Sequence, residues 1–491
     1  MKRLNLLITR VLFNKVDSIG LSIFRIAYSI VFLFELIHLF KYRTIVYDGF
    51  TELNPTLIFM FWIPTVILLL LGYKSRYVAI LNYIFSVIIL SSAQKYEYHG
   101  FTIYTGINFL LMFLPIAKQI SIDAFLKTKI NTDDKKVFKV YYFAPVFLVI
   151  ALIYLDSAFY KFASSMWLSG LGMWLPASLP MATWSSFPWL LNNELLVKFL
   201  GYLVLIFETV FILLMWFRVF RVPLLVIGVL FHLGILFFFP IPWFALSVIC
   251  VYFLMVPIKF WKKIKMEKIN SSVSVMKFLE KYKNKSQDNF RFSEKTIKMS
   301  WILFFLVSFS IQLLLTWRTP FVTKIFSDSI KKEGSLSFKV VAIADKVDYV
   351  SHKFIGMTNH GLFLDDHFRG YSNIIKVVAN DNGKRYLVPL INDNGQPSTY
   401  ITGNLWTNYT FRVSSQHFNL DTYLMNVYPY LVYFCNTNNL KIKNVQFELF
   451  SKNVEVPTEW ERDYLQKMMK KKWDKIGMYS IVENKLVKAT E

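Results

Sequence analysis

Long apolar runs, separated by short polar segments, fill the first 320 residues of the chain. A helix that crosses the hydrocarbon core of a bilayer needs roughly 20 mostly apolar residues. Nine such runs occupy residues 19–40, 56–73, 77–93, 101–117, 141–162, 194–217, 222–239, 242–260 and 300–317. Some are short or carry a polar residue, which favours helices packed in a bundle over isolated helices surrounded by lipid. We therefore expect a polytopic α-helical membrane protein with about nine transmembrane helices.

The connections between these runs alternate in charge. Basic residues gather at the N-terminus and in residues 74–76, 118–139, 218–221 and 262–298, which all fall on one side of a nine-helix arrangement. Loops rich in Lys and Arg stay in the cytoplasm. We therefore expect a protein of the bacterial inner (plasma) membrane with a cytoplasmic N-terminus and an extracytoplasmic C-terminus. Within the long cytoplasmic loop 261–299, residues 275–283 are amphipathic and predict a helix lying on the inner leaflet.

After Pro320 the pattern becomes that of an ordinary globular domain. Strands are predicted at 337–343, 373–379, 385–391 and 444–450, and helices at 420–434 and 457–475. Asp381, Asn382 and Gly383 are typical of a tight hairpin turn between the second and third of these strands. The chain therefore divides into a transmembrane bundle, residues 1–320, and an extracytoplasmic α/β domain, residues 321–491.

Composition supports this division. It also argues against nucleic-acid binding and against a fold held by disulfides or zinc. The formal charge of +23 would suggest nucleic acid on a soluble protein. Here much of the surplus lies between apolar runs, so we interpret it as topology and contact with anionic membrane lipids, with no nucleic-acid partner. Cys250 and Cys435 form neither a disulfide framework nor a zinc motif.

Ionisable residues inside membrane spans are costly and are therefore candidates for function. They are Arg25, Glu35, His38, Asp156, Lys161, Glu208 and His232, with His99 at the start of the fourth run. In the nine-helix arrangement His38, His99 and Lys161 lie near the extracytoplasmic face, and Asp156 lies about 1.4 turns before Lys161. These positions predict a site that faces the outer half of the bilayer.

Each candidate also has a purely structural explanation. Lys161 could extend its amine to the lipid headgroups from a helix end, and His99 could be an interfacial residue beside aromatic side chains. His232 and Glu208 could serve only to bond neighbouring helices, and Asp156 could pair with Lys161. His38, His99 and Asp156 share no ligand spacing, so we expect no metal.

Several segments resemble one known family. The stretch from Tyr154 to Gly170, in which Lys161 is followed by a short polar spacer and then Trp167, resembles the signature of the vitamin K-dependent γ-glutamyl carboxylase and its bacterial relatives. These proteins share the horizontally transferred transmembrane (HTTM) domain. The segments around His99 and His232, and the opening Gly20–Arg25 stretch, are similar to other blocks of that domain. The resemblance covers most of residues 15–320 and extends more faintly into the tail.

The resemblance implies a reaction and roles for individual residues. Lys161 would be the base that deprotonates reduced vitamin K, or reduced menaquinone in a bacterium, and His99 would assist it. His38, Asp156, Trp167, His232 and Glu208 would support the site or line a quinone pocket. The product would be a γ-carboxylated glutamate in an exported peptide or protein. This enzyme hypothesis requires a buried, unpaired Lys161 close to His99.

Two other functions fit the same residues. One is an accessory factor for the maturation or export of a secreted peptide, as in relatives of the domain that export a sporulation-delaying toxin. The other is a membrane protein that binds a quinone or lipid without catalysis.

Overall fold

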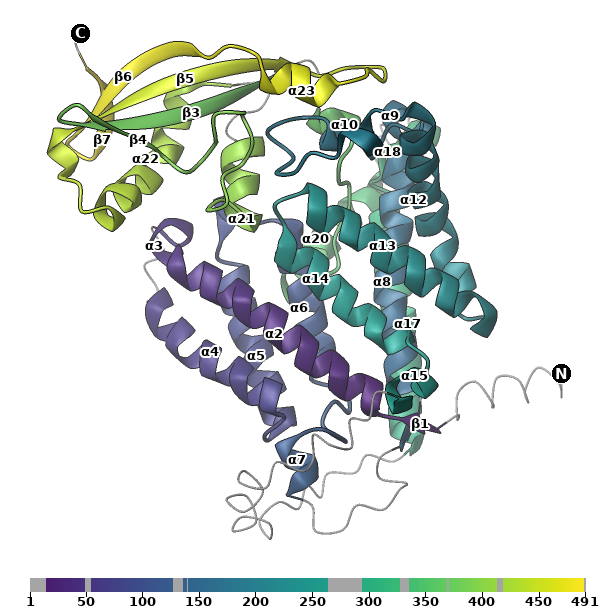
Figure 1. Ribbon diagram of the computed structural model, residues 1–491. Coiled ribbons are helices and arrows are strands. Elements are labelled where there is room, and N and C mark those ends of the chain that lie inside the picture. Colours follow the sequence, from purple (N-terminus) through teal and green to yellow (C-terminus); the bar gives the residue numbers. More distant parts are fainter. Residues whose placement is uncertain are drawn as a thin grey trace.

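The computed structural model describes residues 15–48, 54–126, 136–138, 140–263, 294–326, 335–368, 371–412 and 418–489. The surface helix expected at 275–283, and most of the basic loop that contains it, lie outside these residues. Figure 1 shows a bundle of helices with a β-sheet at one end. Helix α2 (Ile19–Lys41), drawn in purple, crosses the bundle obliquely, and the sheet, drawn in green and yellow, lies over the end of the bundle near α21 (Gly403–Trp406).

Each of the nine apolar runs contains a helix. These are α2 (Ile19–Lys41), α4 (Pro55–Leu71), α5 (Ser75–Leu90), α6 (His99–Leu111), α8 (Val140–Lys161), α12 (Glu194–Leu214), α13 (Arg221–Phe238), α14 (Pro242–Tyr252) and α17 (Glu294–Thr316). Local sequence sets several of their ends. Asn54 caps the start of α4 through a side-chain bond to the Thr56 N–H, and Gly72 ends that helix in the left-handed conformation. Helix α6 ends six residues before its run does, because Pro115 cannot continue a helix.

Three helical stretches in the described part of the chain are both long and apolar enough to cross a membrane: Ile19–Lys41, Glu194–Leu214 and Arg218–Phe238. Four other apolar stretches are shorter, at Pro55–Leu71, Ser75–Leu90, Pro242–Met255 and Ile302–Thr316. Large apolar side chains such as Leu195, Phe199 and Leu303 lie exposed on the outer faces of these helices. Such faces are compatible with a membrane protein, and the number of crossings remains a prediction.

The strand predicted at 337–343 is wrong. These residues belong to α20 (Leu336–Ile355), which packs against α17 and α6. Its N-terminus is capped by the Ser335 side chain, and its three buried residues, Ser337, Ala344 and Ser351, recur every seven positions. This spacing places small side chains along one stripe of the helix, so that tertiary packing overrides the β-propensity of the β-branched residues between them.

The sheet has five antiparallel strands in the order β4-β3-β5-β6-β7. They are β3 (Tyr371–Asp381), β4 (Lys384–Leu387), β5 (Val445–Glu455), β6 (Asp474–Val482) and β7 (Lys485–Lys488). The predicted hairpin turn is confirmed, because Asn382 and Gly383 both have positive φ, as a two-residue type I′ turn requires. The helix predicted at 420–434 is present as α22 (Leu420–Thr437).

The terminal helix predicted at 457–475 is also wrong. Only α23 (Tyr464–Met469) forms there, preceded by Asp463 in the left-handed conformation, and the chain then enters β6 and β7. The buried side chains of α23 are Tyr464, Leu465 and Met468, so the helical spacing of apolar residues is real but lasts less than two turns. Of the two strands after it, β6 pairs with β5 and β7 pairs with β6, which only the assembled sheet allows.

The sheet region rests on the end of the bundle through aromatic contacts. Tyr42, just after α2, lies 5.3 Å from Tyr433 of α22 between ring centroids, and its hydroxyl donates to the carbonyl of Tyr400. The Trp406 indole N–H donates to the carbonyl of Met181 at 3.0 Å. These contacts join the buried residues of bundle and sheet into one continuous core.

Candidate functional site: a buried cavity in the bundle

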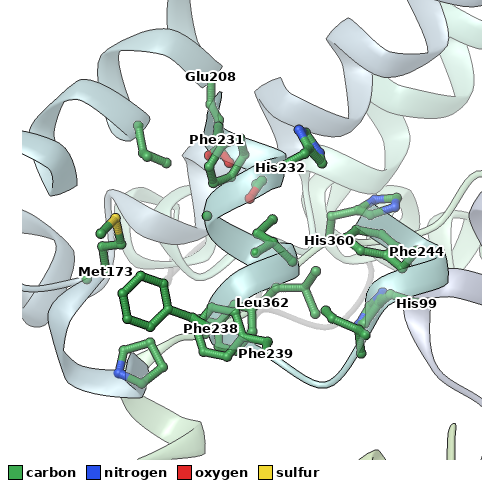
Figure 2. A pocket seen from close by; sticks show the side chains of 18 of the residues that line it. His99, Met173, Glu208, Phe231, His232, Phe238, Phe239, Phe244, His360 and Leu362 are labelled. Carbon is green, nitrogen blue, oxygen red and sulfur yellow. The ribbon is translucent and has the colours of Figure 1, made fainter. Parts of the chain in front are cut away.

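A cavity of about 540 Å³ lies between α6, α8, α12, α13 and α14. Its wall is mostly aromatic and aliphatic, with Phe231, Phe238, Phe239 and Phe244 among the residues that Figure 2 shows around it. A few polar side chains interrupt this apolar surface: Tyr98, His99, Tyr154, Lys161, Glu208, His232, His360 and His367. An apolar pocket with a small set of converging polar groups is the usual form of a small-molecule site.

Lys161 and Glu208 form a buried ion pair in this wall. The Lys161 Nζ atom lies 2.6 and 2.5 Å from the two carboxylate oxygens of Glu208, so α8 and α12 are joined by a two-pronged contact. Both residues are almost fully buried, with relative exposures of 4% and 2%. The same Nζ atom lies 4.3 Å from the centroid of the Trp167 ring, a favourable position for a cation.

Asp156 does not pair with Lys161. Its carboxylate accepts the backbone N–H of His360 at 2.6 Å and the side-chain amide of Gln312 at 3.0 Å. Five residues along an α-helix turn a side chain by about 140°, so Asp156 and Lys161 point from different faces of α8. Asp156 is therefore placed to hold the chain at His360, and it is not among the residues that line the cavity.

The segment 356–368, which follows α20, forms one wall of the cavity. Five of its members line the cavity: His360, Leu362, Phe363, His367 and Phe368. Phe363 stacks on Phe239 with ring centroids 4.6 Å apart, and its carbonyl accepts the indole N–H of Trp167 at 2.8 Å. Its φ of 52° is unusual for a bulky residue. Such strain persists where the surroundings fix the backbone, and it is common at binding sites.

Asp365 clamps this segment to the start of α9 (Ser165–Leu168). One carboxylate oxygen accepts the Ser164 hydroxyl at 2.7 Å and the Met166 N–H at 3.2 Å. The other accepts the Ser165 N–H at 2.7 Å and the Ser165 hydroxyl at 2.9 Å. Partial burial alone would raise the pKa of Asp365, but these hydrogen bonds outweigh it and hold the pKa below its ordinary value.

The tautomers of two cavity histidines follow from their hydrogen bonds. His232 Nδ1 lies 2.8 Å from the carbonyl of Gly228, which can only accept, so Nδ1 carries a proton and Nε2 is left as an acceptor. His367 Nδ1 accepts the N–H of Leu364 at 3.2 Å, so in the neutral ring the proton is on Nε2. Both rings line the cavity.

His360 is the most exceptional of these histidines. Its ring lies 5.8 Å from that of His99 between centroids, on the side of the cavity shown in Figure 2. Both ring nitrogens of His360 are buried and make no hydrogen bond of good geometry among the described residues, although the backbone of Thr358 lies close enough to favour the protonated ring. Burial outweighs this contact and lowers the pKa of His360 to about 4, so the ring is neutral at pH 7. A neutral imidazole offers one donor and one acceptor, so a ligand could pair with whichever of the two the Thr358 backbone does not take up.

The cavity thus brings together five of the seven residues singled out from the sequence: His99, Lys161, Trp167, Glu208 and His232. His38 lies elsewhere, in the last turn of α2, with Nε2 3.5 Å from the Thr402 hydroxyl. Asp156 supports the wall from behind. His360 and His367 were not predicted, because they lie in the part of the chain expected to form a separate domain. The signal that could have found them is the apolar stretch that surrounds His360, from Phe354 to Leu364.

No protein-family model, no curated protein sequence and no solved structure matches this chain.

Proposed function

We propose that this protein binds a hydroquinone in the cavity and removes a proton from one of its hydroxyl groups, as a membrane-embedded enzyme resembling the vitamin K-dependent carboxylases. The observation that carries the proposal is the Lys161–Glu208 ion pair in the wall of an otherwise apolar cavity. Burying two charges costs several kcal/mol per ion, so such a pair is weak evidence for stability alone. A ligand with an apolar ring and ionisable hydroxyls would use both the apolar wall and the pair.

The proposed setting is the inner membrane of a bacterium, with about nine spans, a cytoplasmic N-terminus and an exported sheet region. The basic segments between the apolar runs support this orientation. An apolar hydroquinone would then reach the cavity from the bilayer. Reduced menaquinone is the proposed ligand, since the abundance of Lys, Asn, Ile and Phe is typical of a low-GC bacterium.

The geometry of the pair suggests how the proton moves. Lys161 donates hydrogen bonds to both carboxylate oxygens of Glu208 at 2.5–2.6 Å, so a free amine is not the starting state. We assign the proton-accepting role to the Glu208 carboxylate, which becomes a neutral acid. The Lys161 ammonium keeps its own protons and lies opposite the negative charge left on the ligand oxygen. Trp167 holds the ammonium from a second direction.

His360 and His99 would act at another part of the same ligand. A hydroquinone has two oxygens on opposite sides of its ring. With the first oxygen at the ion pair, His360 can pair with the second through a buried ring nitrogen that makes no hydrogen bond of good geometry in the described part of the chain. In the carboxylases that this chain resembles, the oxygenated hydroquinone supplies the base that removes the γ-proton of glutamate. We propose that this glutamate belongs to an exported peptide or protein, which would be the second substrate.

The second candidate function is binding of a quinone or lipid without catalysis. The ion pair favours this alternative in one respect, because Lys161 is not the unpaired amine that the carboxylase hypothesis requires. In that case the pair would fix the ligand's polar end and no proton would be transferred. Only the catalytic function would produce quinone epoxide, so this product distinguishes the two functions.

The test uses purified full-length protein with reduced menaquinone under air, and quinone epoxide is followed by chromatography. We expect epoxide from the wild type and none from Lys161→Met or Glu208→Gln. The control is Lys198→Met on α12, which removes an exposed ion pair with Glu194 and should leave the product unchanged. The double variant Lys161→Met/Glu208→Gln leaves no unpaired buried charge, so it distinguishes lost chemistry from lost folding. Tight quinone binding without epoxide from the folded wild type would favour the non-catalytic function.

A further inference from the structure

One more buried acid lies close to the cavity, in addition to Glu208 and Asp156, and it contacts neither the Lys161–Glu208 ion pair nor the cavity histidines. Glu35, on α2, has a relative exposure of 0%. Its Oε1 atom lies 3.2 Å from the Tyr98 hydroxyl, and its Oε2 atom is buried with no hydrogen-bond partner among the described residues. No basic side chain in the described part of the chain forms an ion pair with it. An unpaired carboxylate in such a place is very unfavourable, so the acid form is the stable one.

Tyr98 connects this acid to the cavity. Its side chain hydrogen-bonds Glu35 and is itself one of the residues that line the cavity. The position of the ring is tightly fixed. A Cβ atom at Gly100 would come within 2.4 Å of the Tyr98 ring, and Phe101 packs against the ring edge-on at 4.9 Å. Gly100 is therefore required for the ring to lie where it does. In the structure the phenol hydroxyl donates to Glu35 Oε1. Because it can rotate, it can instead accept the proton of the acid form while it donates its own to another acceptor.

We propose that Glu35 is a proton-exchange site that communicates with the cavity through the hydroxyl group of Tyr98. In one transfer the O–H bond of Glu35 breaks and a new O–H bond forms at Tyr98, while the original phenol proton passes to an acceptor in the cavity. Tyr98 ends neutral and Glu35 ends as a carboxylate. The acceptor is water when no ligand is bound, or the basic oxygen of a ligand. The proposal does not depend on which ligand the cavity takes.

The experiment follows the carboxylic acid stretch by infrared spectroscopy after purified full-length protein is diluted into D₂O. The band that belongs to Glu35 is the one lost in Glu35→Gln and displaced in Glu35→Asp, which keeps an acid at the site. We expect the hydrogen-to-deuterium exchange of this band to slow by roughly 10-fold or more in Tyr98→Phe, which lacks the hydroxyl.

Two further variants make the test specific for the cavity. Gly234 lines the cavity, and a Cβ atom there would meet no atom within 4 Å. Gly234→Phe should therefore fill the cavity and slow the exchange to a similar extent. The matched control is Tyr104→Phe, whose hydroxyl lies 3.4 Å from that of Tyr98 although Tyr104 is not among the lining residues. It should exchange at the wild-type rate.

Three results would overturn the proposal. If no acid band disappears in Glu35→Gln, Glu35 does not hold a proton. If Tyr98→Phe exchanges as fast as the wild type, the proton does not pass through the phenol. If Gly234→Phe exchanges as fast as the wild type, the cavity is not the route. None of these measurements requires quinone, so their failure is distinguishable from failure of the proposed hydroquinone chemistry.

Discussion

Asp156 accepts a hydrogen bond from the backbone N–H of His360, a residue 204 positions later in the chain, at 2.6 Å. The second carboxylate oxygen accepts from Gln312. Through this one side chain, α8 fixes both α17 and the wall segment 356–368. It thereby determines where the His360 ring lies in the cavity.

Replacing Asp156 should therefore loosen the wall of the cavity. Asp156→Asn exchanges one acceptor oxygen for an N–H₂ donor, which then faces either the His360 N–H or the Gln312 amide. We expect a loss of about 1–3 kcal/mol in the free energy of unfolding. Thermal unfolding in detergent measures the loss, and hydrogen–deuterium exchange of a peptide spanning 356–368 shows where it acts. Asp345→Asn, at an exposed ion pair, is the control. Unchanged protection of 356–368 in Asp156→Asn would contradict the assigned role.

The Asp365 clamp should depend on pH at the acidic end. Because its pKa is held below the ordinary value of about 3.9, the clamp contributes stability above that pH and loses it as pH falls through the folded-state pKa. Asp365→Asn should expose residues 164–168 to amide exchange already at pH 7. The wild type should match it only in acid, after correction for the intrinsic exchange rate. Equal protection of the two proteins at pH 7 would show that the clamp is dispensable.

The His352–Glu97 ion pair should respond to pH in the opposite direction. The pair joins the last turn of α20 to the loop before α6. The hydrogen bond from His352 to Glu97 is the largest cause of the raised pKa of His352. A raised pKa means that the stabilisation is complete below about 6.5 and is lost as pH rises through the folded-state value. Protection of the α20 C-terminus should thus fall on going from acidic to alkaline pH in the wild type. His352→Gln should show no such step, and a step of equal size in this variant would exclude the pair as its cause.

Alanine substitutions at Gly356 and Gly383 distinguish the cost of backbone strain from the cost of a steric clash. Gly356 and Gly383 both have positive φ, so alanine at either position should cost about 1–2 kcal/mol of strain. A Cβ atom at Gly356 would also lie 2.1 Å from the carbonyl oxygen of Thr102 and 2.6 Å from the N atom of Gly106, whereas one at Gly383 would meet nothing within 4 Å. Gly356→Ala should therefore lower the unfolding temperature well beyond Gly383→Ala. Equal shifts would mean that α6 and the end of α20 can move apart freely.

The sequence predicted the helices of the bundle well, because their signal is local: long apolar runs. It missed where α6 ends, because the predicted run continued past Pro115. It also singled out Lys161, Glu208, His99 and His232, because ionisable residues in apolar runs are conspicuous. It did not predict the partner of Lys161. Asp156 is closer to Lys161 in sequence than Glu208 is. Only its position on a different face of α8 speaks against an ion pair between Asp156 and Lys161.

What the sequence could not supply was the non-local packing. Residues 337–343 are helical because a stripe of small residues on α20 packs against α17 and α6. The local sequence alone, which is rich in β-branched residues, favours a strand. Strand β6 likewise forms because β5 offers it an edge, and β7 forms on the edge of β6. His360 lies in the cavity because α20 packs within the bundle, and the apolar residues around His360 predict that it is buried but not against which helices.

Phe368, whose side chain lines the cavity, is separated by only two residues from Tyr371, the first residue of β3. The cavity wall and the sheet are therefore mechanically in series along one chain. Asp365 holds this stretch of chain to Ser164, Ser165 and Met166. A displacement of β3 would therefore move His367, on the near side of that anchor, before it could reach His360 on the far side.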